Sequence, residues 1–193
     1  MTDGQTGSAM TNKKASGMTR RNKLTIAIAA AFAALGGMAV YAQGKYALKS
    51  PSGIAFADFK GYEDWAVVSS ARTDEALKVI VANPTMIEAY KAGIPGNGQP
   101  FPDGSKIAKL QWKPKKSTEA PFVVDVPDIF TQAFVMEKDS RRFPQSGGWG
   151  YALFNYDAAS DNFTADPSPS DCGHACHVAV KAKDHIFHPY QKR

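Results

Sequence analysis

Short apolar runs, separated by residues that favour turns, recur from residue 65 onward and constrain the fold more than any other feature of the sequence. They are rich in Val, Ile and aromatic residues or alternate apolar with polar positions, which is typical of β-strands. The runs occupy residues 65–70, 76–82, 106–113, 122–126, 129–136 and 149–156. Turns are expected at Pro127, at residues 144–148 and at residues 157–161. Because strands so close in sequence pair most readily in antiparallel fashion, we expect an α+β protein built mainly on an antiparallel sheet.

Helices are expected to flank this sheet. Pro84 suits the first turn of a helix, and Met86 and Tyr90 give that helix an apolar face before Gly93 ends it. Residues 75–81 fit either a strand or a helix, so both interpretations stay open there.

The first 42 residues have the three parts of an export signal. A basic stretch that includes Arg20 and Lys23 precedes an apolar run over residues 24–40, and small residues end at Ala42. This layout predicts a signal peptide over residues 1–42, cleaved after Ala42, and a mature protein in the periplasm. The 17-residue apolar run is close to the length that spans a bilayer, so an uncleaved membrane anchor is the alternative.

The formal net charge of +5 depends largely on that segment. Five basic residues and one acidic residue lie within residues 1–42, so the remainder of the chain is almost neutral. A near-neutral body has no electrostatic reason to bind DNA or RNA, and we expect no nucleic-acid partner. We expect an irregular lead-in over residues 43–60 and one folded domain over residues 61–193, which is long enough for a proper core.

The residues best suited to cofactor chemistry are concentrated near the carboxyl terminus. Both cysteines, Cys172 and Cys176, and all four histidines lie within 17 residues. With His177 directly after Cys176, the order is close to the Cys-x-x-Cys-His haem attachment motif but has one more residue between the cysteines. Two thiols must reach one edge of a porphyrin while the adjacent imidazole turns toward the iron. Because the extra residue places the thiols one helical turn apart, we expect a local bulge, with Cys176 more securely attached than Cys172.

Other interpretations of this cluster remain open. A structural disulfide between Cys172 and Cys176 is compatible with an exported protein. A zinc site that adds His185 and His188 would need a longer separation between the two ligand pairs. Ordinary surface histidines are sufficient to explain His174 and His188.

A helix from Cys172 to about residue 187 is expected to carry the motif. One apolar stripe would pack on the sheet, formed by Ala175, Val178, Ala179, Ala182 and Ile186. His177 would point away from the stripe, on the same side as Gly173 and Val180, where a flat cofactor has room to lie.

Several short motifs follow one another along the chain. They are Gly61-Tyr62-Glu63-Asp64-Trp65, an Asp103-Gly104 turn followed by Lys109, Arg142-Phe143, Trp149-Gly150-Tyr151, and Cys176-His177 followed by Asp184 and Phe187. Together they resemble the cytochrome P460 family over most of the mature chain. The spacing of the two cysteines is the main departure from the family pattern.

The resemblance implies a mostly antiparallel β fold with helical flanks and a C-terminal haem-binding helix, usually as a homodimer. It also implies one five-coordinate haem c in the periplasm, with His177 as the axial ligand of the iron. Members either oxidise hydroxylamine, with nitric oxide or nitrous oxide as product, or bind diatomic gases. We therefore expect a haem oxidoreductase that oxidises hydroxylamine or nitric oxide and passes electrons to a soluble electron-transfer cytochrome. A non-enzymatic binder of nitric oxide or carbon monoxide is the first alternative, and a haem-free module with a disulfide is the second.

The resemblance further implies site residues beyond the cysteine motif. Enzymatic members have a lysine cross-linked to the porphyrin, which corresponds to Lys109, and a distal carboxylate that moves protons. The parity of the strand leaves open whether Lys109 or the more apolar face of Ala108 and Leu110 is turned toward the haem. Asp157 and Asp161 are the candidates for the distal acid. The other candidates for contact with the cofactor are Arg142, Phe134 and Trp149, with Phe101 and Phe122 as further aromatic groups.

Overall fold

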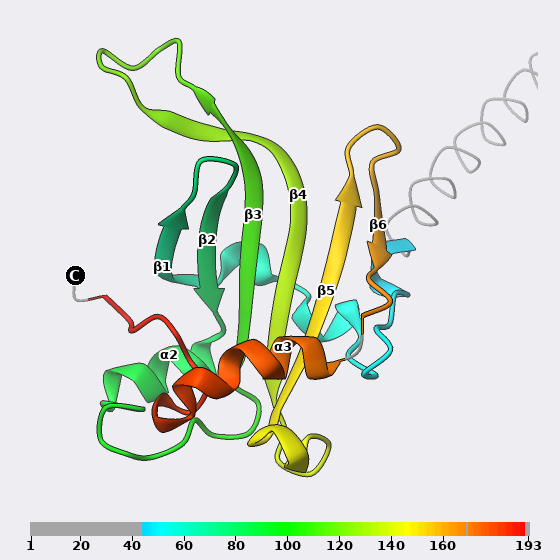
Figure 1. Cartoon of the computed structure of the whole chain (residues 1–193), viewed down its shortest axis with the longest axis vertical. Helices are drawn as coiled ribbons and strands as arrows, with labels where there is room; N and C mark the ends of the chain where they lie inside the picture. Colours follow the sequence, from blue (N-terminus) through cyan, green and yellow to red (C-terminus); the bar gives the residue numbers. More distant parts are fainter. Residues whose placement is uncertain (1–43, 169, 192–193) are drawn as a thin grey trace, which may run out of the picture. The chain divides into compact units, whose positions relative to one another are not determined.

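Six antiparallel strands form one sheet in which neighbours in sequence are neighbours in space (Figure 1). They are β1 Ala66–Arg72, β2 Leu77–Ala82, β3 Lys106–Lys116, β4 Asp125–Lys138, β5 Trp149–Asp157 and β6 Asn162–Ala165. The computed structural model describes residues 44–168 and 170–191, so the expected export signal, its cleavage at Ala42 and the alternative anchor lie outside the described residues. Among the described helices, none has the length and apolarity that crossing a membrane requires. The sheet confirms the expected α+β class, and residues 77–82 are a strand rather than a helix.

The structure differs from the sequence prediction in the second half of the sheet. The runs at 122–126 and 129–136 belong to one long strand, β4, and the turn expected at Pro127 is wrong. Pro127 is paired instead with Pro114 of β3, next to an irregularity in the register. Neither proline has an N–H to contribute to the ladder, so the pair is tolerated where regular pairing is already interrupted. The short strand β6, which follows the turn at 157–161, was not predicted.

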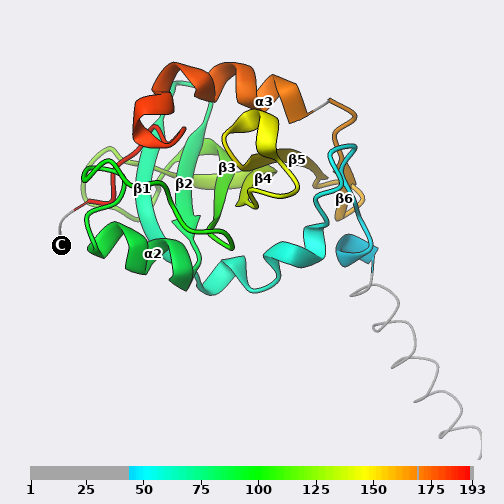
Figure 2. The same ribbon diagram turned by 90° about the horizontal axis from the view of Figure 1, so that it is seen from below.

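The sheet separates two hydrophobic cores. The first core lies on the side that carries the C-terminal segment, together with helix α2, Pro84–Lys91, and helix α3, Ser170–His177. The 3₁₀ turns η1, Phe56–Phe59, and η2, Tyr62–Asp64, lie across the sheet from α3 (Figure 2) and belong to the second core. Strand residues alternate between these cores because successive side chains of a strand point to opposite faces.

The α2 helix forms as the sequence predicts. The side chain of Asn83 accepts a hydrogen bond from the Met86 N–H, 3.1 Å away, and Pro84 occupies the first turn. This cap satisfies one of the amide groups that a helix leaves without a partner at its start. Met86 and Tyr90 are buried in the same core as Ile186 of the C-terminal segment.

The packed body begins earlier than the strand pattern indicates. Ile54, Phe56 and Phe59 are fully buried in the second core, although they lie within residues 43–60, where an irregular lead-in is expected. A short 3₁₀ segment has too few residues to show an apolar period, so its burial is not visible in the sequence.

Candidate functional site

A cavity of about 370 Å³ lies between α3 and the facing side of the sheet. Cavities that take cofactor-sized ligands have volumes of roughly 300–1,000 Å³. Its walls are mostly apolar, and they combine strands β2 to β5 with α3 and the segment after it. The strand residues that point into it lie in adjacent rows of the register and include Ile80, Lys109, Phe134, Met136, Tyr151 and Leu153.

Both cysteine thiols border this cavity. Cys172 and Cys176 line it from α3, which continues without interruption from Ser170 to His177. The expected bulge between the two cysteines is therefore absent, and the thiols are one helical turn apart on the side of the helix that faces the cavity. They are free and exposed, so the alternative with a structural disulfide is not formed.

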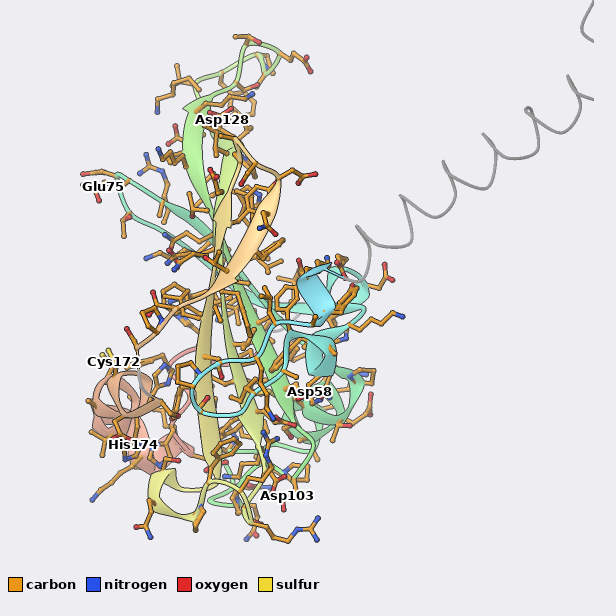
Figure 3. All side chains as sticks on the ribbon, turned by 90° about the vertical axis from the view of Figure 1, so that its right-hand side faces the viewer. Asp58, Glu75, Asp103, Asp128, Cys172 and His174 are labelled. Carbon is orange, nitrogen blue, oxygen red and sulfur yellow. The ribbon has the colours of Figure 1, made fainter. Side chains whose placement is uncertain are left out.

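A zinc site is not formed either. In the described part of the chain, no three or more His, Cys, Asp or Glu side chains are placed so that they could share a metal ion. Figure 3 shows Cys172 and His174 on α3, on the side of the sheet opposite to Asp58 of η1.

Helix α3 meets the sheet with a different face from the one predicted. The stripe expected to pack on the sheet is mostly exposed, at Ala175, Val178, Ala179 and Ala182, and only Ile186 of this set is buried. The side of Gly173 faces β5 instead. A β-carbon added at Gly173 would lie 2.6 Å from Cβ of Tyr151, which is closer than any side chain allows. The missing side chain thus lets α3 approach the strand on the side that carries His177.

The α3 helix also ends earlier than expected. After His177 the chain continues as a 3₁₀ segment, η4, Val178–Lys183, with a non-helical residue at Val180. This change of geometry shifts the phase of the later residues, so one continuous stripe from Ala175 to Ile186 cannot form.

The ring of His177 is held by one specific contact. Its Nδ1 lies 2.7 Å from the carbonyl oxygen of His185, and the rings of Phe187 and Tyr151 flank it at centroid distances of 4.8 and 5.1 Å. Burial lowers the pKa of His177, although the bond to His185 acts in the opposite direction. A neutral ring that donates from Nδ1 keeps a lone pair on Nε2, which is the form that binds a metal.

The carbonyl that binds His177 belongs to an unusual turn. Asp184 and His185 both have positive φ angles, 46° and 64°. Residues other than glycine adopt such angles at a cost of about 1–3 kcal/mol each. The carboxylate of Asp184 accepts hydrogen bonds from Nζ of Lys138, at 2.7 and 3.0 Å, and from the Phe101 N–H, at 2.7 Å. This largely buried ion pair stabilises the turn.

Lys109 extends from β3 into the cavity. Its Nζ lies 3.7 Å from the ring centroid of Phe134, the residue paired with it on β4. Burial, and to a smaller extent the charge of Lys78, lower the pKa of Lys109. Ala108 and Leu110 point the other way, into the second core, so the face that carries Lys109 is the one turned toward α3.

The two candidate acids do not reach the cavity. Asp157 is the last residue of β5, Asp161 lies in the turn that follows it, and both are exposed. Asp157 accepts hydrogen bonds from Ser160 and from the Ala159 N–H, and Asp161 accepts one from the Tyr156 hydroxyl. Their placement fits the ordinary role of acids that stabilise a turn, and it gives no support to a role as distal acid.

The remaining predicted contacts lie elsewhere. Arg142 donates to Glu137, at 2.8 Å, and to the Gly53 carbonyl, at 3.0 Å, and so joins the end of β4 to the N-terminal segment. Trp149 is fully buried in the first core, next to Phe101.

Phe134 therefore differs from the other aromatic candidates. Phe122 is 68 % exposed in the connection between β3 and β4. Phe134 is the member of the aromatic set that lines the cavity.

Some residues of the site were not predicted to contact the cofactor. Tyr151 forms part of the cavity wall, and its hydroxyl is buried without a hydrogen-bond partner among the described residues. Nδ1 of His174 and Nδ1 of His185 are also buried without a hydrogen-bond partner among the described residues. Buried polar atoms of this kind are normally satisfied by ordered water or a bound group. Strand alternation identifies Tyr151 and Leu153 as a pair on one face, but not which face.

Comparison with known proteins agrees with the order of motifs along the chain. A family model described as Cytochrome P460 matches residues 59–188, which is more than half of the chain. No curated protein gives a significant match.

Proposed function

The chain belongs to the cytochrome P460 family, and on this premise we propose that it holds one haem c in the cavity next to α3. The donor set fits such a group, because two free thiols and an imidazole with an available Nε2 border one apolar cavity. The thiols of Cys172 and Cys176 would form the covalent attachment, and His177 would bind the iron. The haem would supply an iron that binds small ligands and exchanges electrons.

We propose nitric oxide as the small ligand that binds at the haem iron. The observation that carries this choice is the lining: the described residues around the cavity include aliphatic and aromatic side chains and Lys109, but neither Asp nor Glu. Oxidation of hydroxylamine releases protons and so requires a group that accepts them. Binding of a diatomic gas requires only an apolar wall, such as Phe134 and Leu153, that keeps water away.

Oxidation of hydroxylamine is the second candidate function. It is favoured by the position of Lys109, whose amine lies in the cavity that Cys176 and His177 also line. In the enzymatic members that the sequence resembles, a lysine is joined to the porphyrin. Such an enzyme would pass electrons to a soluble cytochrome.

Attachment of the haem is tested first. The full chain is expressed with haem maturation factors, and its absorption spectrum is recorded before and after extraction with acidic acetone. We expect the Soret band to stay with the protein and to be lost in Cys172→Ser/Cys176→Ser. His177→Ala should change the ferrous spectrum, whereas His174→Ala, the matched control on the same helix, should not. A chain without a Soret band would refute the proposal.

The two candidate functions are then distinguished with the protein that carries covalently attached haem. Nitric oxide is titrated into the ferrous protein, and hydroxylamine is added separately together with an electron acceptor. We expect a spectral change with nitric oxide and no sustained reduction of the acceptor by hydroxylamine. Turnover with hydroxylamine that is lost in Lys109→Ala would instead establish the second candidate.

Location and assembly belong to the same proposal. We propose that the protein is exported to the periplasm as a homodimer, because the segment before residue 43 resembles an export signal and family members usually pair. Cell fractionation and sedimentation of the purified protein test these two points. A cytoplasmic product or a monomer at micromolar concentration would contradict them.

A further inference from the structure

We propose that Asp184 is a positioning residue for His177. It acts through the neighbouring residue His185, whose carbonyl oxygen accepts the hydrogen bond from the His177 ring. The inference rests on the proposed function in one respect, namely that His177 binds the iron.

The direction of this carbonyl depends on two strained residues. Asp184 and His185 follow each other in the left-handed region, with φ angles of 46° and 64°. The local backbone contacts are ordinary hydrogen bonds, such as the one from the His185 N–H to the Val180 carbonyl at 3.2 Å. Residues with side chains keep such a conformation only when surrounding contacts determine it. The turn therefore needs an external anchor, or the His185 carbonyl would point elsewhere.

Asp184 provides this anchor. Both carboxylate oxygens contact Nζ of Lys138, and one also accepts the Phe101 N–H. Lys138 is the last residue of β4, and its Nζ donates a further hydrogen bond to the Gly147 carbonyl at 2.8 Å. The side chains of Lys138 and Asp184 are 6 % and 11 % exposed, so water screens their attraction little. The carboxylate thus fixes the C-terminal turn to the end of the sheet.

The same loop holds the side chain of His185. A β-carbon added at Gly147 would lie 2.5 Å from Nε2 of His185, so the ring packs directly on the glycine backbone. Gly147 also has a positive φ of 65°, which glycine adopts readily. His185 is therefore held on one side by this contact and on the other by Asp184, and its carbonyl is left to face His177.

The consequence for the iron follows from the hydrogen bond. A carbonyl that accepts from Nδ1 fixes the tautomer and raises the basicity of Nε2. A stronger donor favours the ferric state, so losing this contact should raise the reduction potential and weaken the bond between iron and histidine. Neither effect is expected from a residue that only stabilises the fold.

The test compares Asp184→Asn with Glu88→Gln in the holoprotein. Glu88 pairs with Lys91 at 2.7 Å on the exposed side of α2, so Glu88→Gln removes one carboxylate from an ion pair of the same length that is exposed and does not line the cavity. The readouts are the iron–histidine stretching frequency of the ferrous protein by resonance Raman spectroscopy and the midpoint potential. We expect Asp184→Asn to lower the frequency and raise the potential, and Glu88→Gln to leave both at the wild-type values.

A second variant separates the effect on His177 from a general loss of stability. Removing one partner of a buried pair leaves an unpaired charge, whereas Lys138→Met/Asp184→Asn removes both charges at a smaller cost in stability. We expect the double variant to show the same spectral shifts. Variants that unfold more easily but keep the wild-type frequency and potential would overturn the proposal, because Asp184 would then serve the fold alone.

The full chain prepared without haem gives an independent readout. The tautomer of His177 is read from its ring ¹⁵N shifts by NMR. We expect protonated Nδ1 in the wild type and a mixture of tautomers in Asp184→Asn, and equal populations in both would count against the proposal. If the chain binds no haem, the proposed function fails, while this measurement still decides the role of Asp184.

Discussion

The contact between α3 and β5 at Gly173 leads to the prediction that Gly173→Ala destabilises the protein, although replacing glycine by alanine usually stabilises a helix. Replacing glycine by alanine within a helix normally stabilises it by about 1 kcal/mol. At Gly173, however, the added β-carbon would lie 2.6 Å from Cβ and 2.7 Å from Cγ of Tyr151. Carbon atoms pack at about 3.5–4.0 Å, so the helix and the strand would have to separate by roughly 1 Å.

The cost of this separation decides whether Gly173→Ala stabilises or destabilises the protein. The nearest atom is the β-carbon of Tyr151, which moves only with the backbone of β5, so a change of rotamer cannot relieve the clash. Overpacking of this kind costs about 1–3 kcal/mol. Because the backbone cannot give way easily, we take the upper part of that range. After the gain in helix propensity of about 1 kcal/mol, we expect Gly173→Ala to lower the free energy of unfolding by about 1–2 kcal/mol.

The assay is urea unfolding followed by circular dichroism, with Ala175→Gly as the control on the same helix. Ala175 is exposed, so its replacement should cost only the helix propensity, about 1 kcal/mol. Gly173→Ala should also displace the thiols and change the Soret band, whereas Ala175→Gly should not. If Gly173→Ala were instead more stable than the wild type by about 1 kcal/mol, the close approach of α3 to β5 would be refuted.

Three further predictions concern attachment, pH dependence and the core. Cys172→Ser should retain haem on Cys176 in mass spectra of the C-terminal peptide, and haem kept in Cys176→Ser but lost in Cys172→Ser would reverse that order. Burial raises the pKa of Tyr90 above its ordinary value of 10.0. The stability gained from its neutral form is therefore complete below about pH 10 and lost above it as the unfolded chain ionises. Urea midpoints should fall less steeply between about pH 9 and 11 in Tyr90→Phe than in the wild type, and equal slopes would show that folding leaves the pKa of Tyr90 unchanged. Met86 is fully buried, so Met86→Ala should cost about 2–5 kcal/mol in urea unfolding, and a cost near zero would mean that α2 packs loosely.

Local pattern in the sequence was enough to predict the kind of elements that form. The apolar runs and the turn residues between them predicted the strands that became β1 to β5, and Pro84 with Gly93 predicted α2. These signals are local, because alternation along a strand and the chemistry of a turn depend on neighbours in the chain. The resemblance to the cytochrome P460 family could likewise be recognised from motifs in order, and the family match confirms it.

The arrangement of the site required the tertiary structure. Strand alternation separates Lys109 from Ala108 but does not say which of the two faces α3, since that choice depends on what covers each side of the sheet. Apolar spacing predicted the wrong face of α3, because the close approach at Gly173 arises from a missing side chain and leaves no period in the sequence. The partner of His177 is a backbone carbonyl, which every residue has. Only the dihedral angles at residues 184 and 185, held by a lysine 46 positions away, determine that this one carbonyl meets the ring.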